Sequence, residues 1–239
     1  MIKFFRKIRQ KLLSENKFSK YLIYAIGEIV LVVIGILIAL QINNWNENRK
    51  NENQGIIQKK ALKIELENDL ETFKSDLDYV KKELKINKSY AKRLSSKTSN
   101  LDTLVKIVRY EFDGTYNSLN ELNKTTFNSL ESTSKLGILG DDLAKNIQNY
   151  YNTRDNGIEI LSNNRELYFS LLELTIPKYP TNWSSIQGHL QDIYWEKINK
   201  NTLYGDFNGL LTMRIFNLDV RKRVVEDLIT KTNHLLKEL

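Results

Sequence analysis

Hydrophobic residues follow two kinds of pattern along this chain: one unbroken apolar run and several stripes at helical spacing. The run covers residues 21–42, reading YLIYAIGEIVLVVIGILIALQI, and contains one charged residue, Glu28. A helix of about 22 residues, rising ~1.5 Å per residue, crosses about 30 Å of hydrocarbon. The run is longer than the ~7 to 15 apolar residues of a secretory signal, and no small-x-small cleavage site follows it. It therefore predicts an uncleaved transmembrane helix, and its length argues against the buried helix of a soluble protein.

Beyond Gly55 the apolar residues recur in steps of four and three, which is the pattern of a helix that packs against others. The seam, as we call this stripe, consists of Leu66, Leu70, Phe73, Leu77, Val80 and Leu84. Its register continues through Asn87 to Leu94, and Lys, Glu and Asp occupy the other faces, as on a solvated helix. We therefore expect one long coiled-coil-like helix over residues 56–94.

Shorter stripes predict further helices over residues 101–112, 126–136, 141–176, 184–200 and 207–239, whereas residues 113–140 are less regular. Capping boxes begin at Ser118 and Ser184, and Pro177 and Pro180 end the longest of these helices. The expected fold class is all-α, with one N-terminal transmembrane helix and an exported antiparallel bundle of about four helices. The expected divisions are a leader at 1–20, the membrane helix at 21–42, a juxtamembrane connector at 43–55 and the helical bundle at 56–239.

Charge is distributed unevenly, and this changes the interpretation of the net charge of +7. Residues 1–50 hold nine Lys or Arg and three Glu, whereas the other 189 residues hold 27 basic and 26 acidic side chains. The large domain therefore has no basic footprint for nucleic acid, and we expect no nucleic-acid partner. Seven basic residues precede the apolar run, so the positive-inside rule places the N-terminus in the cytoplasm and exports the domain.

The basic leader also has apolar residues at helical spacing, with Ile2, Phe5 and Leu12 between the charges. A segment of this kind lies along the inner surface of the bilayer, although a solvated basic tail has the same composition. The expected membrane-surface residues are Lys3, Arg6, Lys7, Arg9 and Lys11.

Glu28 needs an explanation, because a carboxylate about 10 Å into the hydrocarbon costs roughly 2.5–3.5 kcal/mol unless it binds a proton. Val32, Gly35 and Ala39 follow it at helical spacing, so its face includes a small-x-x-x-small pair that allows close approach of a helix. This face predicts a second helix, in a homo-oligomer or in another envelope membrane protein. Protonation in lipid, or a position nearer the membrane surface, is the alternative.

The residue patterns that identify common enzymes are missing from this sequence. It has no cysteine, its two histidines fall on different expected helices, and it has no Gly-rich phosphate loop and no Gly-x-Ser-x-Gly elbow. His189, Asp192 and Glu196 share one helix face, but a metal site would need further ligands, so a solvated face is the simpler reading. We expect no catalysis, no metal and no cofactor.

Aromatic residues are concentrated around the two prolines. The set that could form a pocket is Tyr179, Trp183, Tyr194 and Trp195. Such a group either lines a ligand site at one end of the bundle or packs where helices converge on loops, and the second reading is favoured.

The leader and the apolar run together resemble a known family. The resemblance is found in Ile2-Lys3-Phe4-Phe5-Arg6, in Gly27-Glu28-Ile29, and in Ala39-Leu40-Gln41-Ile42-Asn43-Asn44-Trp45. Phe127-Asn128-Ser129-Leu130 and Asn149-Tyr150-Tyr151-Asn152 extend it into the domain. The family is an uncharacterised one of small bacterial membrane proteins, known only as a domain of unknown function. The resemblance implies an inner-membrane protein of Gram-negative bacteria that faces the periplasm, and it implies no activity, ligand or catalytic residue.

These observations favour a non-enzymatic envelope scaffold or interaction module, in which the anchor fixes a helical domain that binds itself or another envelope protein. A periplasmic sensory bundle that signals through a membrane partner is the alternative, because such bundles change their helix packing on binding a ligand. A hydrolase with an unrecognised site ranks last.

Overall fold

The chain folds mainly as helix. The computed structural model describes residues 18–119, 121–182 and 184–239, and over these residues it contains helices and connecting segments but no β-strand. The all-α class expected from the sequence is therefore confirmed. The chain divides into two compact units, Met1–Ile57 and Gln58–Leu239.

Exposed apolar side chains dominate the described part of the first unit. Helix α2 spans Phe18–Leu94 and contains one segment that is long and apolar enough to cross a membrane, with a mean hydropathy of 2.7. From Leu22 to Ile42 the large apolar side chains expose 46–69 % of their surface. No part of that segment is buried within the described protein.

The juxtamembrane connector expected at 43–55 is helical, and α2 continues through it without a break. The stretch Asn46–Gln54 is polar but contains no proline, and its Glu, Arg, Lys and Gln residues are good helix formers. Gly55 alone costs about 1 kcal/mol relative to alanine, which the flanking helix offsets. Polarity in this segment therefore marks a change of surroundings rather than a break in the backbone hydrogen bonds.

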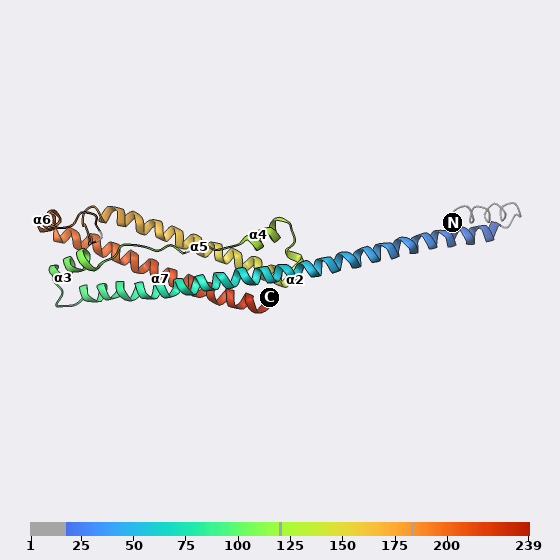
Figure 1. Cartoon of the computed structure of the whole chain (residues 1–239), viewed down its shortest axis with the longest axis horizontal. Helices are drawn as coiled ribbons and strands as arrows, with labels where there is room; N and C mark the ends of the chain where they lie inside the picture. Colours follow the sequence, from blue (N-terminus) through green and yellow to red (C-terminus); the bar gives the residue numbers. More distant parts are fainter. Residues whose placement is uncertain (1–17, 120, 183) are drawn as a thin grey trace. The chain divides into compact units, whose positions relative to one another are not determined.

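Three long helices build the second unit: α2 from Gln58 onward, α5 (Asp141–Thr175) and α7 (Lys200–Glu238). Figure 1 shows α5 running in the direction of α2, with α7 returning in the opposite direction. The shorter elements are α3 (Leu101–Lys106), a π-helix (Ile107–Glu111), α4 (Thr125–Ser132), a 3-10 helix (Leu136–Leu139) and α6 (His189–Lys197).

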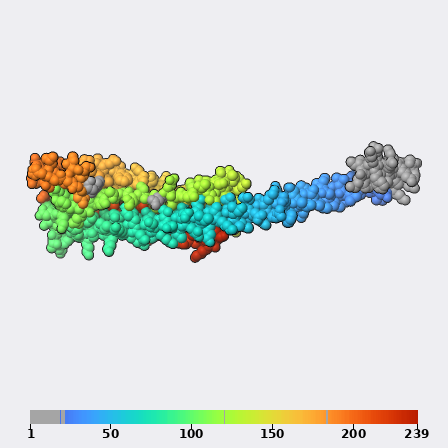
Figure 2. All heavy atoms as spheres, in the orientation of Figure 1, coloured from blue at the N-terminus to red at the C-terminus, as the bar shows by residue number. Residues whose placement is uncertain are grey.

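The fourth position of the bundle is taken by an extended segment rather than by a helix. We call residues 112–119 and 121–124 the strap; they have no regular secondary structure and connect the π-helix to α4. Figure 2 shows green and lime side chains of this region filling the surface between α2 and α5. The capping box expected at Ser118 therefore starts no helix, and the bundle has three long helices and a strap.

Two further helix boundaries differ from the sequence expectation. The helix expected from Ser184 begins at His189, because the side-chain amide of Gln187 donates to the Ser184 carbonyl at 3.2 Å instead of capping a helix. The last helix begins at Lys200 rather than at Phe207, because the Asn199 side chain accepts from the backbone N–H of Asn201 and Thr202. Because Asn199 caps it, α7 begins two turns earlier than the apolar stripe predicts.

The core changes character along the bundle. Near the end of α2 it is aromatic, with Tyr90, Phe112, Tyr168 and Phe207 buried together, and Phe112 meeting Phe207 edge to face at 5.1 Å. At the opposite end Phe127 stacks on Tyr151 with ring centroids 4.1 Å apart. Between them α5 and α7 approach closely, since a Cβ placed on Gly157 would lie 3.0 Å from Val224 Cγ1.

Candidate functional site

The least expected feature of the bundle is a row of ion pairs in its core. Asp69, Asp76 and Glu83 lie on α2 at intervals of seven residues, and the two aspartates are 2 % and 9 % exposed. Each meets an arginine that is 1 % exposed. The pairs, which we call the ion-pair ladder, are Asp69 with Arg154 on α5, and Asp76 with Arg221 and Glu83 with Arg214 on α7.

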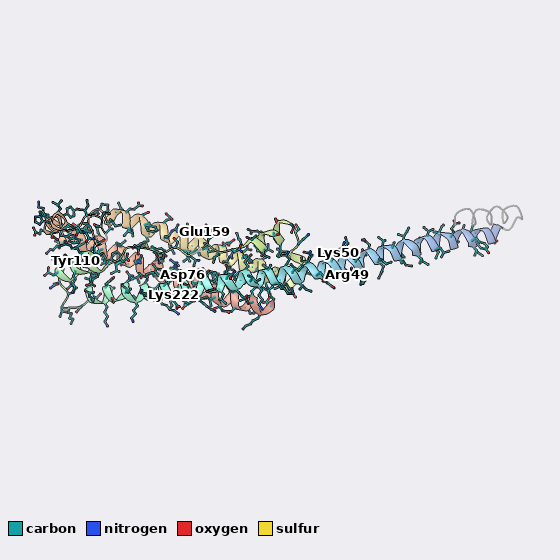
Figure 3. The ribbon with its side chains drawn as sticks, viewed as in Figure 1. Arg49, Lys50, Asp76, Tyr110, Glu159 and Lys222 are labelled. Atoms are coloured by element: carbon teal, nitrogen blue, oxygen red, sulfur yellow. The ribbon has the colours of Figure 1, made fainter. Side chains whose placement is uncertain are left out.

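The geometry of the ladder is that of direct hydrogen-bonded pairs. Arg154 Nη1 lies 2.6 Å from Asp69 Oδ2, and Arg214 Nη2 lies 2.9 Å from Glu83 Oε2. Arg221 donates twice to Asp76, with Nε 2.9 Å from Oδ2 and Nη2 bonded to Oδ1. Figure 3 marks Asp76 on α2 inside the bundle. A planar guanidinium suits this role because it is always charged and can bind both oxygens of a carboxylate.

The same arginines hold the strap in place. Arg154 donates to the Asn123 carbonyl at 3.0 Å, and Arg214 and Arg221 donate to the carbonyls of Thr115 and Asn117 at 2.5 Å. Tyr168 donates to the Gly114 carbonyl at 2.9 Å. An extended segment makes no helical hydrogen bonds of its own, so these side chains bind carbonyls that, at the exposed residues Thr115, Asn117 and Asn123, would otherwise rely on water.

A second acid near one end of the ladder supports α4. Tyr151 donates to Glu65 Oε1, while Glu65 Oε2 accepts from the backbone N–H of Thr126 at 2.9 Å. Burial raises the pKa of the Tyr151 hydroxyl, and its bond to Glu65 raises it further. Burial also raises the pKa of Asp69, against the opposing effect of Arg154. The acids therefore anchor backbone and side-chain donors, and this is a structural role.

Among the described residues, no group of three or more His, Asp or Glu side chains is arranged to hold a metal ion. Of the three residues that share a helix face around His189, Asp192 forms an ion pair with Arg109. That guanidinium also lies 5.7 Å from the centre of the Trp195 ring.

The aromatic residues expected to form a pocket are only partly brought together. Tyr179 and Tyr194 line one shallow cavity of about 280 Å³, together with Lys178 and Lys197. Trp195 instead lies in the core, 5 % exposed, and donates from Nε1 to the Pro180 carbonyl at 2.9 Å. Trp183 lies outside the described residues. The Tyr179 hydroxyl donates to Asp206 at 3.0 Å, and burial followed by this bond raises its pKa to about 12.

The predicted helix-packing face around Glu28 and the basic residues of the leader both belong to the first unit. Val32 is 58 % exposed, Gly35 has open space where a side chain would be, and Ala39 is exposed. Glu28 is partly exposed. The leader residues Lys3, Arg6, Lys7, Arg9 and Lys11 lie outside the described residues. The seam lies in the second unit and faces the core: Leu66, Phe73 and Val80 are 0 % exposed, Leu84 is 6 %, and Leu70 and Leu77 are half-buried.

Comparison with known proteins identifies a family. A model of a family of unknown function, DUF6090, matches residues 28–216, which is most of the chain. The chain belongs to this family. The DUF6090 match begins at Glu28 in the apolar segment, passes through the strap and ends at Phe216 on α7. Arg221 lies beyond it. No curated protein and no solved structure matches the chain.

Proposed function

We propose that this DUF6090 chain is a non-enzymatic scaffold of the cell envelope, anchored in the inner membrane by residues 21–42. The basic leader lies in the cytoplasm, on the anionic surface of the bilayer, and the bundle lies in the periplasm. The proposal agrees with the resemblance of the leader and apolar run to small bacterial membrane proteins.

One observation carries the proposal. The large apolar side chains from Leu22 to Ile42 expose 46–69 % of their surface. Leaving a large aliphatic side chain in water rather than burying it costs roughly 1.5–3 kcal/mol, so a row of more than ten costs well over 10 kcal/mol. Hydrocarbon removes this cost, and a helix satisfies its own backbone groups there.

In this proposal the bundle binds a partner and carries out no catalysis. Its buried acids are bonded to arginine, tyrosine or backbone groups, so they are occupied in holding the helices and the strap. We propose that the partners are a second copy or another envelope membrane protein, which packs on the face of Glu28, Val32, Gly35 and Ala39. Small residues on that face allow the close approach that drives helix association in lipid.

The alternative, a sensory bundle that signals through a membrane partner, is favoured by the cavity of Tyr179 and Tyr194. A ligand there would lie at one end of α7, between its first turn and α6. Small molecules that copurify with the purified protein would support sensing, whereas a stoichiometric protein partner from mildly solubilised membranes supports the scaffold.

Topology is the sharpest test of the anchor. Alkaline phosphatase fused after Leu239 should be active, and the protein should stay in the membrane pellet after carbonate extraction. A Val33→Arg variant, which places a charge near the middle of the span, should reduce the membrane fraction because insertion then costs roughly 2.5–3.5 kcal/mol more. A cytoplasmic reporter, or extraction of the unaltered protein by carbonate, would refute the proposal.

The Glu28 face needs its own test. A Gly35→Leu variant adds bulk where a partner helix would approach, while Leu37→Ala alters another exposed position of the same helix. We expect the first to abolish crosslinking of the full-length protein to its partner and the second to leave it intact. Equal crosslinking of both would show that this face packs on nothing.

A further inference from the structure

A cavity of about 120 Å³ lies between the strap, α5 and α7. Two arginines line it, Arg165 on α5 and Arg221 on α7, and none of the described residues that line it is acidic. Its other walls consist of side chains that are apolar or carry a hydroxyl group. The cavity therefore offers positive charge and hydrogen-bond donors without a negative charge of its own.

The local structure of α5 and the strap explains why these side chains surround one space. Ile158, Leu161, Ser162 and Arg165 follow the spacing i, i+3, i+4 and i+7, so they share one face of α5. The extended strap supplies the facing wall. Arg165 Nη1 donates to the Ser118 hydroxyl at 2.9 Å, which joins α5 to the strap at the cavity. A molecule bound here would touch both elements.

Arg165 has donors that the described residues do not use. A guanidinium has five N–H groups. The Nη2 atom of Arg165 donates to Glu166 at 3.0 Å, whereas its Nε is buried and has no hydrogen-bond partner among the described residues. The Glu166 side chain is 66 % exposed, so water screens its attraction for Arg165. An anion in the cavity gains affinity by accepting from donors that are otherwise left unpaired.

The neighbouring arginines do not compete for such an anion with free carboxylates. Arg221 is 1 % exposed and lines the inner end of the cavity. Asp76 neutralises Arg221, and Glu83 neutralises the nearby Arg214. The charge of Arg165 is therefore the local excess, and it attracts an anion more strongly at this partly buried position than it would in bulk water.

Guanidinium and hydroxyl groups are donors that recognise carboxylates and phosphates. The apolar walls of Leu119, Ile158 and Leu161 add a surface for an aliphatic group, which phosphate lacks. We infer that this cavity binds a small carboxylate with a short aliphatic tail, whose oxygens accept from Arg165 and from the hydroxyl groups beside it. The volume has room for several water-sized groups, which suits an acid of about four carbons. All lining residues belong to the second unit, so this site goes beyond the proposed scaffold and does not depend on the anchor.

Isothermal titration calorimetry tests the site, with full-length protein in dodecyl maltoside and sodium butyrate as the probe at constant ionic strength. We expect saturable binding with a Kd on the order of 1 mM, which is modest for so small a ligand. Arg165→Gln should weaken binding at least about tenfold, because a hydrogen bond to a charged group is lost. Arg223→Gln is the matched control: it removes the same charge from an exposed residue of α7 that does not line the cavity, and it should bind butyrate like the unaltered protein.

Two further probes identify the class of ligand. Butyramide has the shape of butyrate without its charge, and inorganic phosphate has negative charge without the tail. Both should bind at least about tenfold more weakly than butyrate, since each lacks one of the two features that the walls recognise. Butyramide that binds as tightly as butyrate overturns the role of Arg165, and phosphate that binds as tightly overturns the role of the apolar walls.

A second variant keeps both arginines and so separates loss of the site from loss of the fold. Ser162→Leu fills the cavity from an exposed position of α5. It should weaken butyrate binding at least as much as Arg165→Gln does, with an unchanged far-UV circular dichroism spectrum. The site is overturned if the unaltered protein shows no saturable binding, if butyrate still binds to Ser162→Leu, or if the two arginine variants lose affinity equally. Each of these outcomes leaves the proposed membrane anchor and its own tests unaffected.

Discussion

Removing the negative charge from one rung of the ion-pair ladder should destabilise the bundle severely. Asp76→Asn keeps the size of the side chain but leaves Arg221, which is 1 % exposed, without its counter-ion. Breaking one partner of a buried ion pair typically costs 3–5 kcal/mol, because the remaining charge stays buried and uncompensated. We expect a loss of about 4 kcal/mol, a large share of the 5–15 kcal/mol that ordinary domains possess.

The double variant Asp76→Leu with Arg221→Met removes both charges and keeps most of the volume. Apolar replacements of whole buried pairs are often neutral, so the remaining cost comes from the Asn117 carbonyl, which loses its donor at 2.5 Å. Asn117 is itself exposed, so water can replace the lost donor and the cost stays near the ~0.5–1.5 kcal/mol of an ordinary hydrogen bond. The double variant should therefore be more stable than Asp76→Asn, although it changes more atoms.

Urea denaturation of the full-length protein in mild detergent, followed by far-UV circular dichroism, measures these differences. Asp227→Asn is the matched control on α7, since Asp227 forms an exposed i,i+4 pair with Lys231 at 2.7 Å. Exposed pairs contribute about 0.3–0.5 kcal/mol. The reasoning is refuted if Asp76→Asn costs no more than Asp227→Asn, or if the double variant is less stable than Asp76→Asn.

Three further measurements test other parts of the fold. Burial is the largest cause that raises the pKa of Tyr150 and Tyr168 to about 12. Their contribution to the free energy of unfolding is therefore complete below pH 10, the ordinary pKa of tyrosine, and is lost as the pH rises towards 12. A spectrophotometric titration should show these two hydroxyls ionising at higher pH than exposed tyrosines, and one uniform transition near pH 10 would contradict this. Gly209→Ala, at a helical position with open space around it, should stabilise α7 by about 0.5–1 kcal/mol. Gly157→Ala should bring no gain in stability, because its new methyl group would crowd Val224 on α7. Equal effects of the two substitutions in thermal unfolding would disprove the close approach of α5 and α7 at Gly157. Tyr151→Phe should cost about 1.5–3 kcal/mol in urea denaturation, because a buried carboxylate loses its donor, and a cost below 0.5 kcal/mol would count against that bond.

The helices of this chain could be anticipated from their periodicity, since local spacing determines which side faces the core. The buried positions Leu66, Phe73 and Val80 follow from steps of three and four alone. The apolar run can be identified in the same way, because a helix that crosses a bilayer needs an unbroken stretch of apolar residues. Such features depend on neighbouring residues, and one sequence contains that information.

The ladder could not be found in this way. Charged residues are seldom buried unless they are paired, so the local pattern places Asp69 and Asp76 on a solvated face. Their partners lie 85 and 145 residues further along the chain, and no local rule connects them. One signal was present: acids at 69, 76 and 83 share a seven-residue interval with the arginines at 214 and 221. Matching heptads of opposite charge on two amphipathic helices would have indicated the pairing.

The strap was missed for a related physical reason. Ser118 and Glu121 have the spacing of a capping box, which predicts a helix when only local hydrogen bonds are considered. In the folded chain arginine side chains bind carbonyls of this segment, so its backbone needs no helix to be satisfied. Tertiary hydrogen bonds replaced local ones here, and they come from residues about 100 positions away.

The ladder also has a consequence for the order in which the protein is made. Glu83 and Asp76 leave the ribosome 131 and 145 residues before Arg214 and Arg221. At about 5–20 residues per second, the first acids wait roughly 7–30 s for their cations. During that interval burial of α2 would leave two carboxylates without their counter-ions, which is costly. The two rungs that involve α7 can therefore form only after Lys200–Glu238 has been synthesised.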